Sequence, residues 1–230
     1  MIECLLLDLD DTILDFRRQE HEAIEKTLRS FGLEPDEVVL ERYSRINQDH
    51  WQRLERKELT REQVLVGRFE TLFREYGMEI DPVCCARTYE NNLSMGHYFL
   101  PGAREAVERL SKKYKLYLAS NGTAHVQAGR LKSADISHFF QDIFISQSMG
   151  ANKPDLLYFE RCFARMPGFT PQTTLMVGDS LSSDILGAKQ AGIPACWVNP
   201  QGKPHPENLC PDYEIQSLSQ LEALLETISL

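Results

Sequence analysis

Two aspartates close to the N-terminus suggest chemistry that neither could do alone. Asp8 and Asp10 follow an apolar run and stand two residues apart. In an extended backbone such side chains share a direction, so their carboxylates repel one another unless a cation or a shared proton compensates the charge. Asp179 could supply a third carboxylate, and no His or Cys partner accompanies these residues. Because oxygen ligands alone favour a hard cation, we predict a Mg²⁺ site rather than a zinc site.

A hydroxyl and a lysine add a hydrogen-bond donor and a positive charge, which carboxylates lack. Ser120 follows a second apolar run, and Lys153 stands before Pro154. Carboxylates, a cation, a donor and a lysine together suit phosphoryl transfer, where positioning and charge neutralisation supply most of the catalysis. Each piece taken singly is more often a turn or a helix cap. Their joint occurrence in one chain is what predicts a site.

The elements that must position these residues have the pattern of an α/β fold. Residues 2–9 are mostly apolar without alternation, as in a parallel strand covered on both faces. After Pro101, strand-like runs alternate with helical stretches, which predicts a parallel sheet with crossover helices. We expect further strands at 116–119, 143–145, 175–177, 195–198 and 213–215, and helices at 103–113, 124–134, 155–165, 184–191 and 217–228. Ligands of such sheets bind beyond the carboxyl ends of the strands, where the polar clusters should converge.

The segment 16–100 has a wholly helical pattern. Ile24, Leu28 and Phe31 share one helical face, and Thr60 with Gln63 forms a capping-box sequence. About four helices without a strand, inserted after a single strand, indicate a separate helical subdomain. We therefore expect a Rossmann-like, three-layer core made of residues 1–15 and 101–230, with an inserted all-helical cap at 16–100.

Composition and charge argue against a nucleic-acid-binding, membrane-binding or exported protein. The chain has 230 residues and a formal net charge of −9. An acidic surface disfavours general binding to nucleic acid or to a membrane surface, because both need a basic field. There is no run of eighteen apolar residues, the N-terminus lacks the basic flank of a signal peptide, and the six cysteines show no metal-site spacing. We expect a cytoplasmic protein.

Four motifs, in chain order, resemble the signature motifs of the haloacid dehalogenase-like (HAD) hydrolases. They are Asp8-x-Asp10-x-Thr12, Ser120-Asn121-Gly122, Lys153-Pro154 and Gly178-Asp179-x4-Asp184. The helical insertion is similar to the cap of subfamily I of that superfamily. The resemblance implies that Asp8 is the nucleophile and Asp10 the general acid and base. It also implies that Asp8, the main-chain carbonyl of Asp10, and Asp179 bind Mg²⁺.

The same resemblance implies a two-step phosphatase mechanism through an aspartyl-phosphate. Ser120, Asn121 and Lys153 would hold the phosphoryl oxygens. Asp184 would orient the loop or a water on the cation, and Thr12 would fix the geometry of the first motif. Dehalogenases of the superfamily lack the second aspartate of that motif, so Asp10 favours phosphate ester over carbon–halogen chemistry.

The cap sequence indicates which phosphate ester is used. The stretches 47–51 and 67–70 resemble those of bacterial pyrimidine 5′-nucleotidases, and so do the core stretches 175–179, 183–187 and 196–199. A nucleobase needs an aromatic face and a few amide or guanidinium partners. Phe16, Trp51, Asn47 and Arg68 could supply them. Two of these remain open, because Trp51 could equally pack within the cap and an arginine such as Arg68 is more often solvated or paired on its own helix.

The resulting prediction is a Mg²⁺-dependent phosphatase for a small ester, most simply a nucleoside monophosphate. A phosphatase for a sugar phosphate, phosphoglycolate or another small metabolite is the main alternative. A haloacid dehalogenase and a non-catalytic metabolite-binding module are further alternatives. The oligomeric state is left open.

Overall fold

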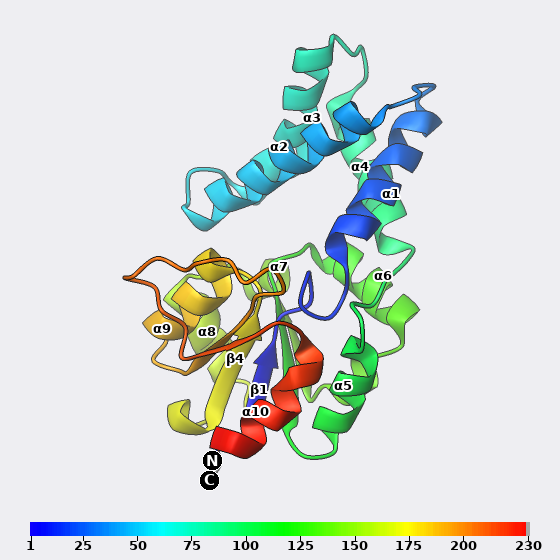
Figure 1. The fold of residues 1–230 in the computed structure, drawn as a ribbon. Coiled ribbons are helices and arrows are strands. Elements are labelled where there is room, and N and C mark those ends of the chain that lie inside the picture. Colours follow the sequence, from blue (N-terminus) through cyan, green and yellow to red (C-terminus); the bar gives the residue numbers. More distant parts are fainter. Residues whose placement is uncertain (229–230) are drawn as a thin grey trace.

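The core of the protein is one parallel sheet. A computed structural model describes residues 1–228. Its sheet has six strands in the order β3-β2-β1-β4-β5-β6, and every neighbouring pair is parallel (Figure 1). The strands are β1 Cys4–Leu7, β2 Lys115–Ser120, β3 Asp142–Ile145, β4 Thr174–Gly178, β5 Ala195–Val198 and β6 Tyr213–Ile215. The predicted α/β fold is confirmed, and β1 lies at the centre between β2 and β4.

Helices cover both faces of the sheet, which explains why β1 is apolar without alternation. Leu5 and Leu7 pack in a core with residues of α5, α6 and α10, whereas Cys4 and Leu6 pack in a second core with residues of α8 and α9. These helices are α5 Ala103–Ser111, α6 Ala124–Ala134, α8 Leu156–Phe163, α9 Leu186–Gln190 and α10 Leu221–Ile228. The three-layer arrangement buries both faces of the strand.

Several element boundaries differ from the expected ones. The chain leaves the sheet after Leu7 rather than Leu9, and Asp11 adopts a left-handed backbone with φ 56°. The expected helix 184–191 begins instead with a π-helical turn, Leu181–Ile185, because the Ser180 carbonyl accepts hydrogen bonds from the amides of both Asp184 and Ile185. The short helix α7, Ser146–Met149, was not predicted, since a single turn has no periodicity to detect. Short 3₁₀ helices are found at Ser137–Phe139, Pro171–Thr173 and Leu218–Gln220.

The segment between β1 and α5 forms four helices, as predicted. They are α1 Phe16–Ser30, α2 Glu37–Glu55, α3 Arg61–Tyr76 and α4 Pro82–Ser94, and we call them the cap. The cap has an apolar core of its own, in which the rings of Tyr43, Phe69 and Tyr89 lie 5.2–5.6 Å apart. The predicted capping box of Thr60 and Gln63 begins α3. The cap lies beyond the carboxyl ends of the strands and therefore over the expected site (Figure 1).

The described part of the chain contains neither a disulfide bond nor a membrane-spanning helix. All six cysteines are free thiols. Within residues 1–228, no helix combines the length and the apolar character needed to cross a membrane.

Candidate active site

The polar clusters named from the sequence lie together at the carboxyl ends of the three central strands. Asp8 directly follows β1, Ser120 ends β2 and Asp179 directly follows β4. Asp8, Asp179 and Lys153 line a cavity of about 410 Å³. The cavity extends from the strand ends to the cap, where Asn47 and Trp51 line it. This juxtaposition follows from the strand order, because β2 and β4 both pair with β1.

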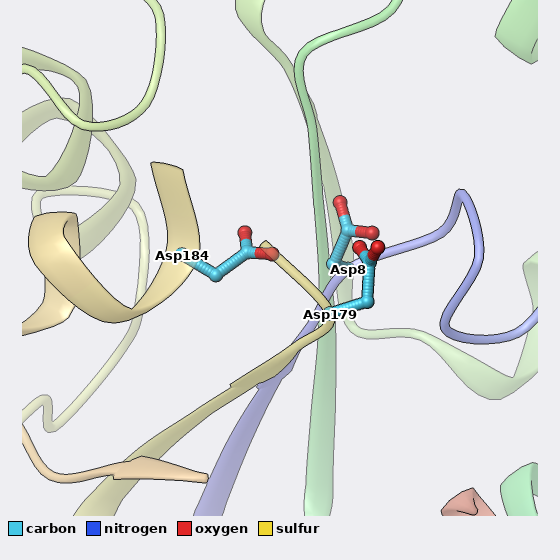
Figure 2. Close-up of side chains that lie close together, drawn as sticks. All are labelled: Asp8, Asp179 and Asp184. Atoms are coloured by element: carbon cyan, nitrogen blue, oxygen red, sulfur yellow. The ribbon is translucent and has the colours of Figure 1, made fainter. Parts of the chain in front are cut away.

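Three carboxylates form a compact acidic cluster. One oxygen from each of Asp8, Asp179 and Asp184 lies within 4.8 Å of the others. Figure 2 shows the side chains of Asp8 and Asp179 next to one another, with that of Asp184 directed toward them. Burial, and then the neighbouring carboxylates, raise the pKa of Asp8 to about 8 and the pKa of Asp179 well above its usual range. Such a cluster of oxygen donors without His or Cys fits a hard divalent cation such as Mg²⁺.

Lys153 supplies the one ammonium in contact with this cluster among the described residues. Its Nζ donates hydrogen bonds to Asp8 Oδ1 at 2.7 Å, Asp184 Oδ1 at 2.6 Å and the Ala119 carbonyl at 2.7 Å. Burial alone would lower the pKa of Lys153, but the charges of Asp184 and Asp8 outweigh burial and raise it. One positive charge facing three carboxylates leaves the cluster net negative when all are ionised, which again fits a bound cation.

Asp184 also holds the loop that carries Asp179. Its Oδ2 accepts a hydrogen bond from the Ser180 amide at 3.1 Å, and its side chain is fully buried. The close approach requires glycine at position 178, because a Cβ there would lie 2.1 Å from Asp184 Oδ2. Asp184 thus connects the Lys153 ammonium to the Asp179 loop.

Ser120 is buried behind Gly122 and Gln127, which line the cavity, and is not itself among the lining residues. Its Oγ accepts from Gln127 Nε2 at 2.8 Å and from the Gly122 amide at 3.2 Å, and its side chain is fully buried. Among the described groups its own hydroxyl hydrogen has no acceptor. A phosphoryl oxygen placed in the cavity would provide one.

Asn121 has a contact that the sequence did not indicate, and Thr12 makes no side-chain hydrogen bond among the described residues. The Asn121 side chain exchanges two hydrogen bonds of 2.9 Å with the backbone of Lys153, so its amide holds the lysine loop. Thr12 is fully buried, and its Oγ1 has no hydrogen-bond partner among the described residues. Asn121 therefore acts on Lys153 in this structure.

The carboxylate of Asp10 is hydrogen-bonded to one residue and ion-paired with another, and neither was expected from the sequence. Its Oδ2 accepts from Gln127 Nε2 at 2.6 Å, and its Oδ1 is ion-paired with Arg130 Nη1. Both partners belong to α6, which begins shortly after the Ser120 motif. The only sequence signal was a polar pair at i, i+3 on an otherwise ordinary helix, and that spacing alone does not say what the pair faces.

Residues of the cap form the far wall of the cavity. Phe16, Asn47, Trp51 and Arg68 all line it, and so does Glu20, which the sequence analysis did not single out. Asn47 donates to Glu20 Oε1 at 2.6 Å and accepts from Arg68 Nη1 at 2.7 Å. The structure thus aligns an acidic, an amide and a basic side chain in one hydrogen-bonded row, and burial raises the pKa of Glu20.

Of the two expectations for Arg68, exposure to solvent is wrong, whereas pairing on its own helix is found, because Arg68 Nε donates to the Leu65 carbonyl at 3.3 Å. Arg68 is only 2% exposed, because its guanidinium packs 4.8 Å from the centre of the Tyr89 ring in addition to its bond with Asn47. Trp51 is half-buried on the cavity wall, with the guanidinium of Arg61 5.4 Å from its ring centre.

Arg61 joins the cap to the loops of the site. Its guanidinium donates to the carbonyls of Asn121 at 3.1 Å and Gly122 at 3.3 Å, and to Ser146 Oγ at 2.6 Å. It also contacts Asn152, next to Lys153. These contacts tie the start of α3 to both phosphate-binding motifs expected from the sequence.

The parallel sheet, the inserted helical cap and the acidic cluster between them define the class of protein: an α/β fold with its site between core and cap. The chain belongs to the haloacid dehalogenase-like hydrolase family, whose model matches residues 2–192. It is therefore a hydrolase, and the predictions of the family and of an enzyme are confirmed.

Individual relatives match over nearly the whole chain. The HAD-hydrolase YfnB of Bacillus subtilis is 38% identical over 96% of this chain and 94% of its own length. Its crystal structure, solved bound to magnesium and described as revealing interdomain movement, has a TM-score of 0.93 and covers 97% of this chain and 98% of that chain. The pyrimidine 5′-nucleotidase PynA of Streptococcus pneumoniae is 34% identical over 94% of this chain and 92% of its own. For the pyrimidine 5′-nucleotidase YjjG of Escherichia coli the identity is 25%, over 96% of each chain.

The acidic cluster leads to a prediction about metal and pH. Mg²⁺ at 100 times its dissociation constant should stabilise the folded state by about 2.7 kcal/mol, which corresponds to roughly 5–10 °C in Tm for a chain of this length. Without the cation, the raised pKa of Asp8, about 8 instead of 3.8, means that the folded state keeps a proton that the unfolded state releases. Metal-free stability should therefore fall as pH rises between about 4 and 8.

Melting curves with Mg²⁺ and with EDTA test this prediction. Because the cation competes with that proton, the gain in Tm should be larger at pH 8.5 than at pH 5.5. Asp179→Asn, which removes one carboxylate of the cluster, should reduce the gain at both pH values. An equal gain at both pH values in the unmodified protein would contradict the assignment.

Proposed function

We propose that the protein is a Mg²⁺-dependent phosphatase that acts through an aspartyl-phosphate on nucleoside 5′-monophosphates, with a preference for pyrimidines. The observation that carries the proposal is a cavity with a carboxylate cluster and Lys153 at its base and an aromatic and polar wall above. The base suits a phosphoryl group, and the wall suits a planar, hydrogen-bonding leaving group.

In the first step Asp8 attacks phosphorus. Lys153 occupies Asp8 Oδ1, which leaves Oδ2 to form the bond to phosphorus. The bond from phosphorus to the leaving oxygen breaks, and Asp10 gives its proton to that oxygen. The hydroxyl of Ser120 and the ammonium of Lys153 hold the phosphoryl oxygens while their charge redistributes.

In the second step water opens the aspartyl-phosphate. The Asp10 carboxylate takes a proton from the water as its oxygen bonds to phosphorus. The bond between phosphorus and Asp8 then breaks, which restores the Asp8 carboxylate and the proton on Asp10. One residue thus serves as acid and then as base, so the two carboxylates have different tasks.

Asp8, Asp179 and the main-chain carbonyl of Asp10 would hold the cation. When bound, Mg²⁺ would offset the charge of the nucleophile and of the phosphoryl group, which otherwise repel one another. Asp184 would support this arrangement through Lys153 and the Ser180 amide. The magnesium-bound structure of YfnB supports the choice of metal.

The cap wall and two relatives support the substrate class. Phe16 and Trp51 offer aromatic faces, and the row of Glu20, Asn47 and Arg68 offers both donors and acceptors. Such a combination matches a nucleobase, which stacks on its faces and hydrogen bonds along its edge. PynA and YjjG, both named pyrimidine 5′-nucleotidases, match over nearly the whole chain.

Alternatives make different demands on the same residues. A sugar phosphate or phosphoglycolate would use the base of the cavity but would have no need of the aromatic faces. A dehalogenase would release halide, which needs no proton, and would leave Asp10 without a task. A non-catalytic module would have no reason to keep three carboxylates at this spacing.

A phosphate-ester panel with Mg²⁺ tests the proposal. We expect UMP, dUMP and dTMP to exceed sugar phosphates in kcat/KM by at least about tenfold. Arg68→Met should raise KM for these nucleotides by about tenfold or more, because a charged hydrogen bond is lost, with little effect on p-nitrophenyl phosphate. Arg74→Met, an exposed arginine on the same helix, is the matched control.

The outcomes separate chemistry from selectivity. A tenfold preference for sugar phosphates would overturn the nucleotide assignment and leave the phosphatase assignment standing. No turnover of any ester, p-nitrophenyl phosphate included, would overturn both.

A further inference from the structure

Two polar side chains lie buried on α6, immediately beside the site. Arg130 is fully buried and Gln127 is 1% exposed. They stand at i, i+3 and so share one face of the helix. Long polar side chains are seldom buried to this extent unless they are paired, so their partners indicate their purpose.

The partners are the two groups that flank the expected leaving oxygen and phosphoryl oxygens. Gln127 Nε2 donates to Asp10 Oδ2 at 2.6 Å and to Ser120 Oγ at 2.8 Å. Gln127 Oε1 accepts from Arg130 Nη1 at 3.0 Å, and the same Nη1 is paired with Asp10 Oδ1. One amide therefore bridges Asp10 and Ser120, and the guanidinium holds both the amide and the carboxylate.

The local backbone accommodates this bridge. Gly122 lies between the Ser120 motif and α6, and a Cβ at this position would be 2.3 Å from Gln127 Nε2. Any larger residue would displace the amide from Ser120 and Asp10. Glycine at this position thus leaves room for the bridge.

The charge of Arg130 has one ion-pair partner among the described residues, Asp10. Its Nε and Nη2 are buried without any hydrogen-bond partner there. A guanidinium left partly unpaired is costly to bury, so general stability is a poor reason for its position. The side chain is placed for Asp10, with the Phe16 ring centre 5.5 Å away on the cap side.

We infer that Gln127 and Arg130 are positioning residues that fix the Asp10 carboxylate relative to Ser120. They set the distance between the group that transfers the proton and the hydroxyl that holds the phosphoryl group. The inference rests on the proposed function, because it concerns the step in which Asp10 protonates the leaving oxygen as the phosphorus–oxygen bond breaks. A proton donor misplaced by about 1 Å costs on the order of 100-fold in rate.

Arg130→Met gives the sharpest test, because Arg130 contacts Asp10 and Gln127 but not Ser120. With a nucleoside monophosphate, whose alkoxide must be protonated, kcat should fall about 100-fold while KM changes little. With p-nitrophenyl phosphate the leaving group needs no proton, so rapid mixing should still show a burst of about one nitrophenolate per enzyme. Steady turnover after the burst should be slow, since Asp10 also serves as the base in the second step. Arg130→Lys keeps the charge and should recover part of kcat.

Gln127→Met keeps the test decisive if Arg130→Met does not fold. It should preserve the burst and lower kcat, and it should also raise KM because Ser120 loses a partner. Arg104→Met is the matched control, since Arg104 donates to the Ala134 carbonyl at the far end of the same helix. Arg104→Met should hydrolyse both substrates at wild-type rates.

The results distinguish this inference from the proposed function. If the wild type is active and Arg130→Met or Gln127→Met retains full kcat, the inference is overturned and the proposed function is not. Loss of the burst in parallel with nucleotide turnover would also overturn it, because it would indicate general damage. A wild-type protein that hydrolyses neither substrate would overturn the proposed function, and the inference with it.

Discussion

Asp8→Asn is expected to lower the turnover of phosphate esters by about 10⁴-fold or more. The amide has nearly the same shape as the carboxylate but cannot form the bond to phosphorus. It also leaves Lys153 Nζ one acceptor oxygen at position 8, so the surrounding contacts can persist. Phosphate release from a nucleoside monophosphate, measured in steady state, gives the rate.

Asp8→Asn should not lose stability, so a lower rate of this variant cannot be attributed to unfolding. Burial raises the pKa of Asp8, so the ionised carboxylate is costly in the absence of a cation. Replacing it by a neutral amide should leave the metal-free Tm unchanged or higher. Asp142→Asn is the control and should retain full activity, because Asp142 lies at the amino end of the edge strand β3, away from the carboxyl ends that carry the site. If Asp8→Asn kept more than about a tenth of the wild-type rate, Asp8 would not be the nucleophile.

Lys153→Met is expected to destabilise the fold by about 3–5 kcal/mol as well as abolish activity. Lys153 is 1% exposed and its ammonium is bonded to two buried carboxylates and a carbonyl. Methionine fills the space but leaves the carboxylates of Asp8 and Asp184 without a counter-charge. Urea denaturation at pH 7.5 in EDTA measures the change in the free energy of unfolding.

A cation should partly compensate for the missing lysine. Mg²⁺ would restore positive charge beside Asp8, so it should stabilise Lys153→Met more than the wild type. Lys112→Met is the control, because Lys112 forms an exposed pair with Glu108 and should change stability by less than about 0.5 kcal/mol. A loss below about 1 kcal/mol for Lys153→Met would contradict the view that this lysine balances the cluster.

Much of the core could be predicted because each strand carries its own signal. The expected strands 195–198 and 213–215 coincide with β5 and β6, and the expected helix 124–134 coincides with α6. Strands covered on both faces are apolar throughout, and helices show a repeat of 3.6 residues. The chemistry-bearing residues could be located for a related reason, since loops after parallel strands converge on one edge.

The cap shows where such reasoning ends. Its helices were expected from periodicity, but the sequence left Arg68 open between solvent, its own helix and the substrate, and it did not single out Glu20. Both are buried because α1, α2 and α3 bring Glu20, Asn47 and Arg68 together. A charged residue on a helix looks exposed until the helix facing it is known.

The sequence by itself determined the order of the elements, the family motifs and the set of residues that can do chemistry. Only the tertiary structure decided how these residues are paired. Asp10 meets Arg130, Asn121 holds Lys153, and Arg61 reaches from the cap to Asn121 of the core. Local patterns report on neighbours within one helix or strand, whereas these contacts join residues 32 to 120 positions apart. Their geometry depends on how separate elements pack, which no local pattern specifies.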